Sequence, residues 1–166
     1  MLKKLLGDKY NIIKNEDNLE EKANQLVNIL FVNKLDKGRK PYIDHLLFIK
    51  NNVNTDEQKI IGLLHDIIET LKISKGELEE IGFPKNITEV IDILTRKDNP
   101  KEDYDEYIER IIESNNIDAL EVKLVDLNHN MDISHIENPS VKDFSRIEKR
   151  YRPNYIKIQN KLNERK

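Results

Sequence analysis

The fold of this chain is decided by the stretch Ile60-Ile61-Gly62-Leu63-Leu64-His65-Asp66-Ile67-Ile68-Glu69-Thr70. Six aliphatic side chains in the nine positions 60–68 predict a buried helix that is too short to cross a bilayer. The same stretch carries adjacent His65 and Asp66, and burying an imidazole or a carboxylate is costly unless the group is paired or binds a metal. Two interpretations follow: a core histidine satisfied by hydrogen bonds to its neighbour, or two ligands that share one divalent ion.

The composition around this stretch favours a single charged, helical domain. The chain has 166 residues, enough for a substantial core, with 37% hydrophobic and 36% charged side chains. The net charge of −3 and the scattered basic residues do not favour a nucleic-acid partner. The absence of cysteine excludes disulfides and thiolate sites, so a metal would be held by histidines and carboxylates. No signal peptide is visible at residues 1–8, so we expect a cytoplasmic protein without a membrane partner.

Helical periodicity with capping signals continues along the rest of the chain. Alternating apolar patterns are absent, so the fold class is predicted to be an all-α, single-domain helical bundle of about seven to nine helices. The domain is expected to span 1–166, with a core of about 20–150, a lead of 1–15 that docks or frays, and a terminal helix in 151–166. Helices are expected at about 19–34, from Pro41 to a break at 52–54, from a Thr55 cap through 60–70, from a Ser74 capping box to Ile81, at 84–94, 104–114 and 117–131, and at 141–163 with an interruption near Pro153. A loop is expected at 98–100.

Four polar side chains lie on or beside the apolar stripes of three of these helices. They are His45, the adjacent His65 and Asp66, and Asp126. Neighbouring helical positions differ by about 100° in direction, so His65 and Asp66 can both lean toward one ion. Ligands in helical bundles reach the core from facing helices in this way. Two imidazoles and two carboxylates suit Mn²⁺, Fe²⁺ or Zn²⁺, and such an ion can activate water and polarise a phosphoryl oxygen.

The segments that carry these residues resemble the HD-domain metal-dependent phosphohydrolases. Among them, the chain is most similar to the hydrolase domain of the RelA/SpoT-type alarmone enzymes and its small stand-alone relatives, which remove pyrophosphate from guanosine tetraphosphate. The matching segments are 37–45, 62–70 and 122–131, the segments 79–83 and 91–96 also follow the family's pattern, and the resemblance covers roughly residues 20–150. It implies a helical bundle of the HD type, metal ligands at the four positions named above, and Mn²⁺ as the expected ion.

The resemblance also implies which groups act on the water. Glu69 follows His65 by one helical turn and shares its face, so it is the expected catalytic carboxylate. The family places an Asp directly after this Glu, whereas this chain has Thr70. A threonine hydroxyl can orient a water but cannot accept its proton, so the activity should be weak or depend on Glu69 alone. The alternative for Glu69 is an ordinary charge on the helix surface.

Candidate substrate-binding residues flank the predicted ligands. Lys37, Arg39 and Lys40 form a basic turn before the first histidine helix, which suits phosphate groups or is simply a solvated turn. Asn130 follows Asp126 by one turn and is expected to contact the substrate or to support the ligands. The segment 30–34 departs from the guanine-nucleotide pattern of the alarmone enzymes.

Four further side chains have an open role. Tyr104 and Tyr107 either stack on a base or pack in the core, and Arg96 is a candidate phosphate contact. His129 is expected to be a core or surface histidine and not a ligand.

Together these features predict an enzyme, a metal-dependent phosphohydrolase acting on a nucleotide or alarmone pyrophosphate through metal-activated water. A small phosphorylated nucleotide is therefore the expected partner. Two alternatives stay open: a nucleoside monophosphate phosphatase, and a catalytically weakened HD module that binds a nucleotide or a protein. Thr70 is the feature that favours the weakened module.

Overall fold

All regular structure in the described residues is helical, which confirms the predicted all-α fold. The computed structural model describes residues 1–98 and 100–165, so Asn99 in the predicted 98–100 loop and Lys166 at the end of the predicted terminal segment lie outside it. None of the helices in the described part combines the length and apolarity that a membrane crossing requires. The helices are α1 (Leu2–Leu6), α2 (Lys9–Lys14), α3 (Leu19–Leu30), α4 (Tyr42–Asn51), α5 (Asp56–Leu64), α6 (Ile67–Leu71), α7 (Lys75–Glu80), α8 (Lys85–Leu94), α9 (Tyr104–Glu113), α10 (Ile117–Met131), α11 (Val141–Arg146), the π-helical turn η1 (Ile147–Tyr151) and α12 (Arg152–Asn163).

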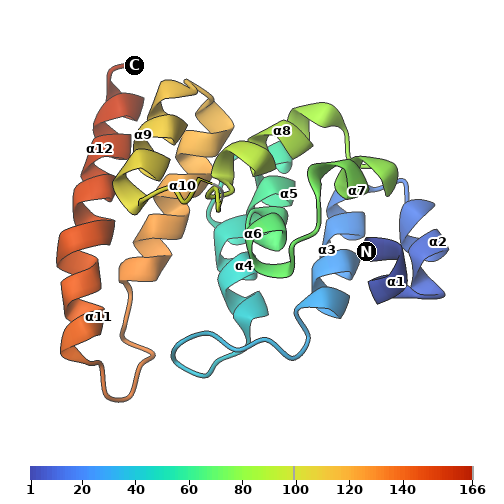
Figure 1. The fold of residues 1–166 in the computed structure, drawn as a ribbon, viewed down its shortest axis with the longest axis horizontal. Coiled ribbons are helices and arrows are strands. Elements are labelled where there is room, and N and C mark those ends of the chain that lie inside the picture. The colour runs from blue at the N-terminus through green and yellow to red at the C-terminus, as the bar shows by residue number, and fades with distance from the viewer. Residues whose placement is uncertain (99, 166) are drawn as a thin grey trace.

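The helices are arranged along one long axis. Helices α9, α10 and α12 form one end of the molecule, α1 and α2 form the other, and α4, α5 and α6 lie between them (Figure 1). The loop before α4 meets the loop after α10, where Asp36 Oδ2 lies 3.3 Å from His135 Nε2. Segments that lie far apart in the sequence, at residues 36 and 135, therefore come together beside α4 and α10.

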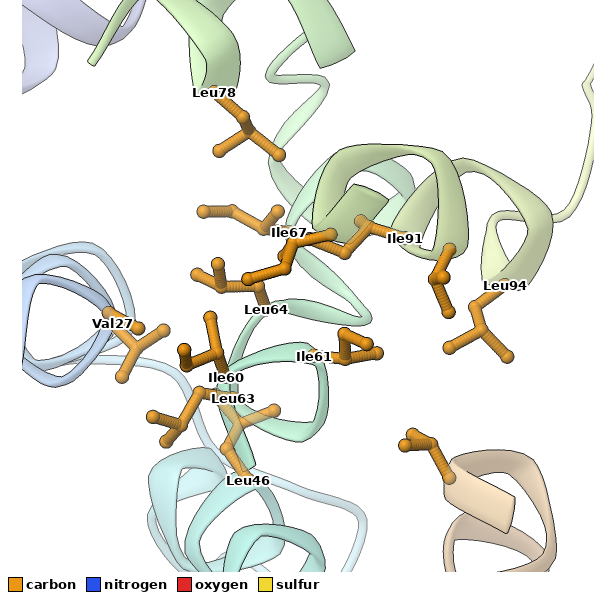
Figure 2. Close-up of a cluster of buried hydrophobic side chains, with 14 of the residues drawn as sticks. Val27, Leu46, Ile60, Ile61, Leu63, Leu64, Ile67, Leu78, Ile91 and Leu94 are labelled. Carbon is orange, nitrogen blue, oxygen red and sulfur yellow. The ribbon is translucent and has the colours of Figure 1, made fainter. Parts of the chain in front are cut away.

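Helix α5 is the centre of the hydrophobic core. Figure 2 shows its side chains and that of Ile67 surrounded by residues from α3, α4, α7 and α8. Fully burying an aliphatic side chain of this size stabilises the fold by about 1.5–3 kcal/mol. The central residues are Ile60, Ile61, Leu63, Leu64 and Ile67, and their neighbours include Val27, Leu46, Leu78, Ile91 and Leu94.

Gly62 allows α5 to pack closely on α4. A Cβ atom at this position would lie 2.9 Å from Ile49 Cγ2 and 3.3 Å from the backbone nitrogen of Lys50. Any larger side chain would push the two helices apart, at a typical overpacking cost of about 1–3 kcal/mol. The glycine in the deciding stretch thus brings the end of α5 close to the last turn of α4.

The prediction of one continuous helix over 60–70 is wrong at His65 and Asp66. The chain turns there, between the end of α5 and the start of α6. His65 Nδ1 lies 2.8 Å from Gly62 O, the carbonyl that would accept the helical hydrogen bond of the Asp66 N–H. Both candidate ligands therefore lie at a helix break and not inside a helix.

The N-terminal lead packs against the bundle. The lead docks through Leu2, Leu6 and Ile13, which are buried, whereas Leu5 and Ile12 face solvent.

Helix α3 ends at residue 30, earlier than the predicted 34, because the chain turns at 31–34 to reach α4.

The predicted interruption of the last helix near Pro153 is confirmed. The turn η1 has π-helical geometry and directly precedes α12, in which Pro153 is the second residue. Proline lacks the N–H that a regular helix would donate, so a local change of hydrogen-bond pattern before it is expected. As a result, residues 141–163 form one helical arm that contains a π-helical turn.

Candidate metal centre

Three of the four predicted ligands converge at one buried point. His45 comes from α4, His65 from the turn between α5 and α6, and Asp126 from α10, and one ligand atom of each lies within 4.8 Å of the others. His45 Nε2 is 3.3 Å from Asp126 Oδ1, and His65 Nε2 is 3.9 Å from the same oxygen. All three side chains are buried. We refer to them as the His–His–Asp cluster.

The imidazole of His65 is held so that one nitrogen is left for an ion. Its Nδ1 is positioned to donate to Gly62 O, while its buried Nε2 makes no hydrogen bond within the described residues, although the carboxylate oxygens Asp66 Oδ2 and Asp126 Oδ1 lie 3.3 and 3.9 Å away. A buried polar atom without a hydrogen bond is rare and needs an explanation. A role as a ligand of a metal ion would be a sufficient one. Burial lowers the pKa of His65, but the carboxylates of Asp66 and Asp126 outweigh it and raise the pKa to about 9. Nε2 is therefore the nitrogen that can exchange a proton for an ion.

Asp66, the fourth predicted ligand, lies beside the cluster. Its Oδ2 is 3.3 Å from His65 Nε2 and accepts a hydrogen bond from the Tyr42 hydroxyl. Its side chain is 23% exposed, more than those of the cluster. Burial opposes ionisation, yet the His65 imidazole holds the pKa of the Asp66 carboxyl below its usual range. Asp66 is thus an anion within reach of an ion in the cluster, oriented by a tyrosine that the sequence analysis did not identify.

Asp126 is fixed by two residues of its own helix. Lys123 Nζ donates to Oδ2 at 2.6 Å, and Asn130 Nδ2 donates to Oδ1 at 2.5 Å and to the Asp126 carbonyl at 2.9 Å. Asn130 thus supports the carboxylate, one of its two predicted roles. Lys123 was missed, although its position three residues before Asp126 places it on the same helical face. Its ammonium group lies 4.9 Å from the centre of the Tyr107 ring, which is buried with it.

A cavity of about 410 Å³ opens next to the cluster. His45 and Asp126 line it, as do Tyr104 and Tyr107. The Tyr107 hydroxyl donates to Leu94 O at 2.5 Å, which identifies this ring as a buried packing element. Tyr104 is less buried and shares the wall, and Arg150 Cζ lies 4.9 Å from the centre of its ring.

The two predicted catalytic residues differ in position. Glu69 lines the cavity. Its Oε2 accepts a hydrogen bond from the backbone N–H of Arg96 at 3.2 Å, and its Oε1 lies 3.7 Å from Nη2 of the Arg96 guanidinium. Arg96 also lines the cavity. Thr70 is not among the cavity-lining residues of the described chain, because one helical step turns it by about 100° from Glu69. The expectation that Thr70 orients the water has no support in this position.

The basic side chains at the cavity are only partly those predicted. Lys37 lines the cavity, whereas Arg39 and Lys40 are exposed and outside its lining within the described residues. Arg146 and Arg150, from α11 and η1, take their place. Burial and repulsion from Arg146 and Arg150 lower the pKa of Lys37, with Asp143 acting in the opposite direction. We call Lys37, Arg146 and Arg150 the basic rim.

A sequence signal for this part of the rim exists. Residues 141–152 hold five basic and two acidic side chains in a chain of net charge −3. This local excess indicates a basic surface, but it does not indicate which cavity the surface faces.

The fold and the site together define an all-helical protein with a buried His–His–Asp cluster that can bind a metal ion. No protein-family model matches the chain, and a comparison with curated proteins finds no relative. The assignment of function therefore depends on the geometry of the site and on the sequence motifs described above.

Proposed function

We propose that the chain is a metal-dependent phosphohydrolase of the HD type that acts on a phosphorylated nucleotide, with an alarmone or nucleotide pyrophosphate as the preferred class. One observation carries this proposal: the unpartnered Nε2 of His65 faces His45 and Asp126 beside a cavity with a basic rim. A purely structural histidine in a core would have both ring nitrogens bonded. Basic side chains that converge on one part of a largely polar cavity suit phosphate groups.

The residues that would hold the ion are His45, His65, Asp126 and Asp66. Mn²⁺ is the expected ion, with Fe²⁺ or Zn²⁺ compatible with the same donors. When bound, such an ion lowers the pKa of water and polarises a phosphoryl oxygen. Two carboxylates balance the charge of a divalent ion, and the adjacent Lys123 adds one positive charge. The net positive site favours a phosphate anion over a neutral ligand.

Other residues would act on water and substrate. Glu69 lines the cavity and would orient the attacking water and accept its proton. The basic rim would hold phosphates that do not react, through charge-assisted hydrogen bonds. Tyr104 lies on the same wall, and its ring, 4.9 Å from Arg150 Cζ, would help to hold that guanidinium toward the phosphates.

A second candidate is a nucleotide-binding module with little or no turnover. The observation that favours it is the pairing of Glu69 with Arg96, which engages both carboxylate oxygens. Thr70 supports it further, because it provides no second carboxylate beside Glu69. In this reading the ion and the rim would bind a nucleotide without an effective base.

Metal analysis of the purified protein, combined with hydrolysis assays in added Mn²⁺, tests the proposal. The panel would contain guanosine tetraphosphate, nucleoside di- and triphosphates, and nucleoside monophosphates, with Asp126→Asn as the inactive control. We expect one tightly bound ion per chain and pyrophosphate release from at least one member. Tight nucleotide binding without turnover would favour the binding module. A protein that binds no divalent ion would overturn both candidates.

A further inference from the structure

A second imidazole contacts His45 through the ring nitrogen that does not face the cluster. His129 lies on α10, three residues after Asp126, and its Nδ1 is 2.8 Å from His45 Nδ1. The two ring centres are 4.9 Å apart. At this distance one nitrogen must carry a proton and donate it, and the other must accept it.

Packing holds His129 in this position. Its ring lies against Phe48, with 4.2 Å between centroids and an interplanar angle of 36°. Phe48 follows His45 on α4, so His129 is fixed between the two helices that supply His45 and Asp126.

The direction of this hydrogen bond decides whether His45 can bind an ion. If His45 Nδ1–H donates to His129, then Nε2 of His45, which faces Asp126 Oδ1 at 3.3 Å, can present its lone pair. If His129 donates instead, neutral His45 carries its proton on Nε2. That proton would point at Asp126 and block the ion.

We propose that His129 is a positioning residue of the metal centre, whose Nδ1 accepts the Nδ1–H of His45 and directs Nε2 of His45 to the ion. The inference rests on the proposed function, because the direction of the bond matters only if an ion is held. Metal-binding histidines commonly donate their second N–H to a carboxylate or a carbonyl, and here an imidazole takes that place.

Two substitutions of His129 distinguish a hydrogen-bond acceptor for the Nδ1–H of His45 from a ring that only packs against Phe48. His129→Phe keeps a ring against Phe48 but has no acceptor, whereas His129→Asn loses the ring and keeps an oxygen near the place of Nδ1. The probe is Zn²⁺ or Mn²⁺ alone, titrated by calorimetry into the metal-free full chain. We expect His129→Phe to bind the ion about 10- to 100-fold more weakly, and His129→Asn to be closer to the wild type. The opposite order, with His129→Phe unchanged and His129→Asn weakened, would show that the ring only packs.

Nitrogen NMR of the histidine side chains in the metal-free wild type gives a readout that does not depend on the variants folding. We expect an unprotonated Nδ1 on His129 and a protonated Nδ1 on His45. A proton on His129 Nδ1 would overturn the inference.

The two proposals fail in distinguishable ways. A wild type that binds no ion removes the proposed function and, with it, any ion for His45 to hold. If the wild type and His129→Phe bind the ion equally tightly, the proposed function stands and only the role of His129 is removed.

Discussion

The two sides of the cavity differ in how their side chains are held. The His–His–Asp cluster is buried, and its members come from α4, from the α5–α6 turn and from α10, which pack around the core. The basic rim lies on a loop and on the C-terminal helical arm, and Lys37 and Arg150 are exposed. Arg146 Nη1 lies 3.4 Å from the Asp143 carboxylate.

This difference separates two tasks that a metal-dependent hydrolase must combine. A small ion needs ligands held to within a fraction of an ångström, which rigid, buried side chains provide. Phosphate groups of a larger ligand tolerate movement, which long, solvated side chains provide. Substitutions in the cluster should therefore act in an all-or-none manner, and substitutions in the rim should act in a graded manner.

The largest effect is expected from His65→Ala. It removes the Nε2 that would bind the ion. Loss of a residue that only supports a ligand typically weakens metal binding by about 10- to 100-fold, so for loss of a ligand itself we expect ion affinity to fall by more than about 100-fold, with no measurable hydrolysis. The loaded protein should also lose thermal stability, because the ion ties three helical segments together. Elemental analysis and thermal melts measure both. His135→Ala is the matched control, since this imidazole pairs with Asp36 outside the cluster, and an unchanged ion content in His65→Ala would contradict the site.

Glu69→Gln should separate catalysis from ion binding. Glu69 lies outside the cluster, so we expect a full ion content and a turnover reduced about 10²-fold or more for a lost general base. Steady-state kinetics with the best substrate of the panel gives the measurement. Glu113→Gln, at an exposed site on α9, serves as the control. Full activity in Glu69→Gln would place the base elsewhere.

Ion affinity should depend on pH through His65. The pKa of about 9 means that a proton occupies the imidazole at neutral pH in the absence of an ion, and the ion must displace it. Protonation competes with the ion below that pKa, so affinity should fall about tenfold for each pH unit of acidification. Calorimetric titrations between about pH 6.5 and about pH 8.5 would show this slope. An affinity that does not change over this range would contradict a protonated His65.

Arg150→Ala tests the graded behaviour of the rim. We expect about a tenfold rise in KM for the phosphorylated ligand, with kcat and ion content little changed, from one lost charge-assisted hydrogen bond. The effect should shrink at high salt because the side chain is exposed. Arg152→Ala is the control, since this exposed residue pairs with Glu148. An equal rise in both variants would indicate general attraction and not a rim contact.

The smallest effect is expected from Thr70→Asp. The resemblance alone predicts a faster enzyme, because it restores the family's second carboxylate. The position of Thr70 outside the cavity lining predicts no change in the rate of guanosine tetraphosphate hydrolysis. Single-turnover rates decide between them, and an increase would show that this side chain reaches the water after all.

Much of the cluster was predictable because helical periodicity is local. His45 and Asp126 fall on apolar stripes, so their burial could be predicted from their neighbours alone. The direction of His65 depended on one hydrogen bond to Gly62, which no periodicity encodes, and the predicted continuous helix was wrong there. The role of Lys123 was visible in principle at helical spacing from Asp126, but its ring contacts were not.

The sequence by itself determined the all-helical fold, the buried position of α5 and the helices that carry the cluster, because each depends on side chains a few residues apart. Only the tertiary structure decided which basic residues border the cavity. Lys37 reaches it while Arg39, with a φ of 65°, does not, and Arg146 and Arg150 arrive from an arm more than a hundred residues away in the sequence. A cavity wall is assembled from distant segments, so its membership depends on how the helices pack and on loop dihedral angles that the local pattern leaves open.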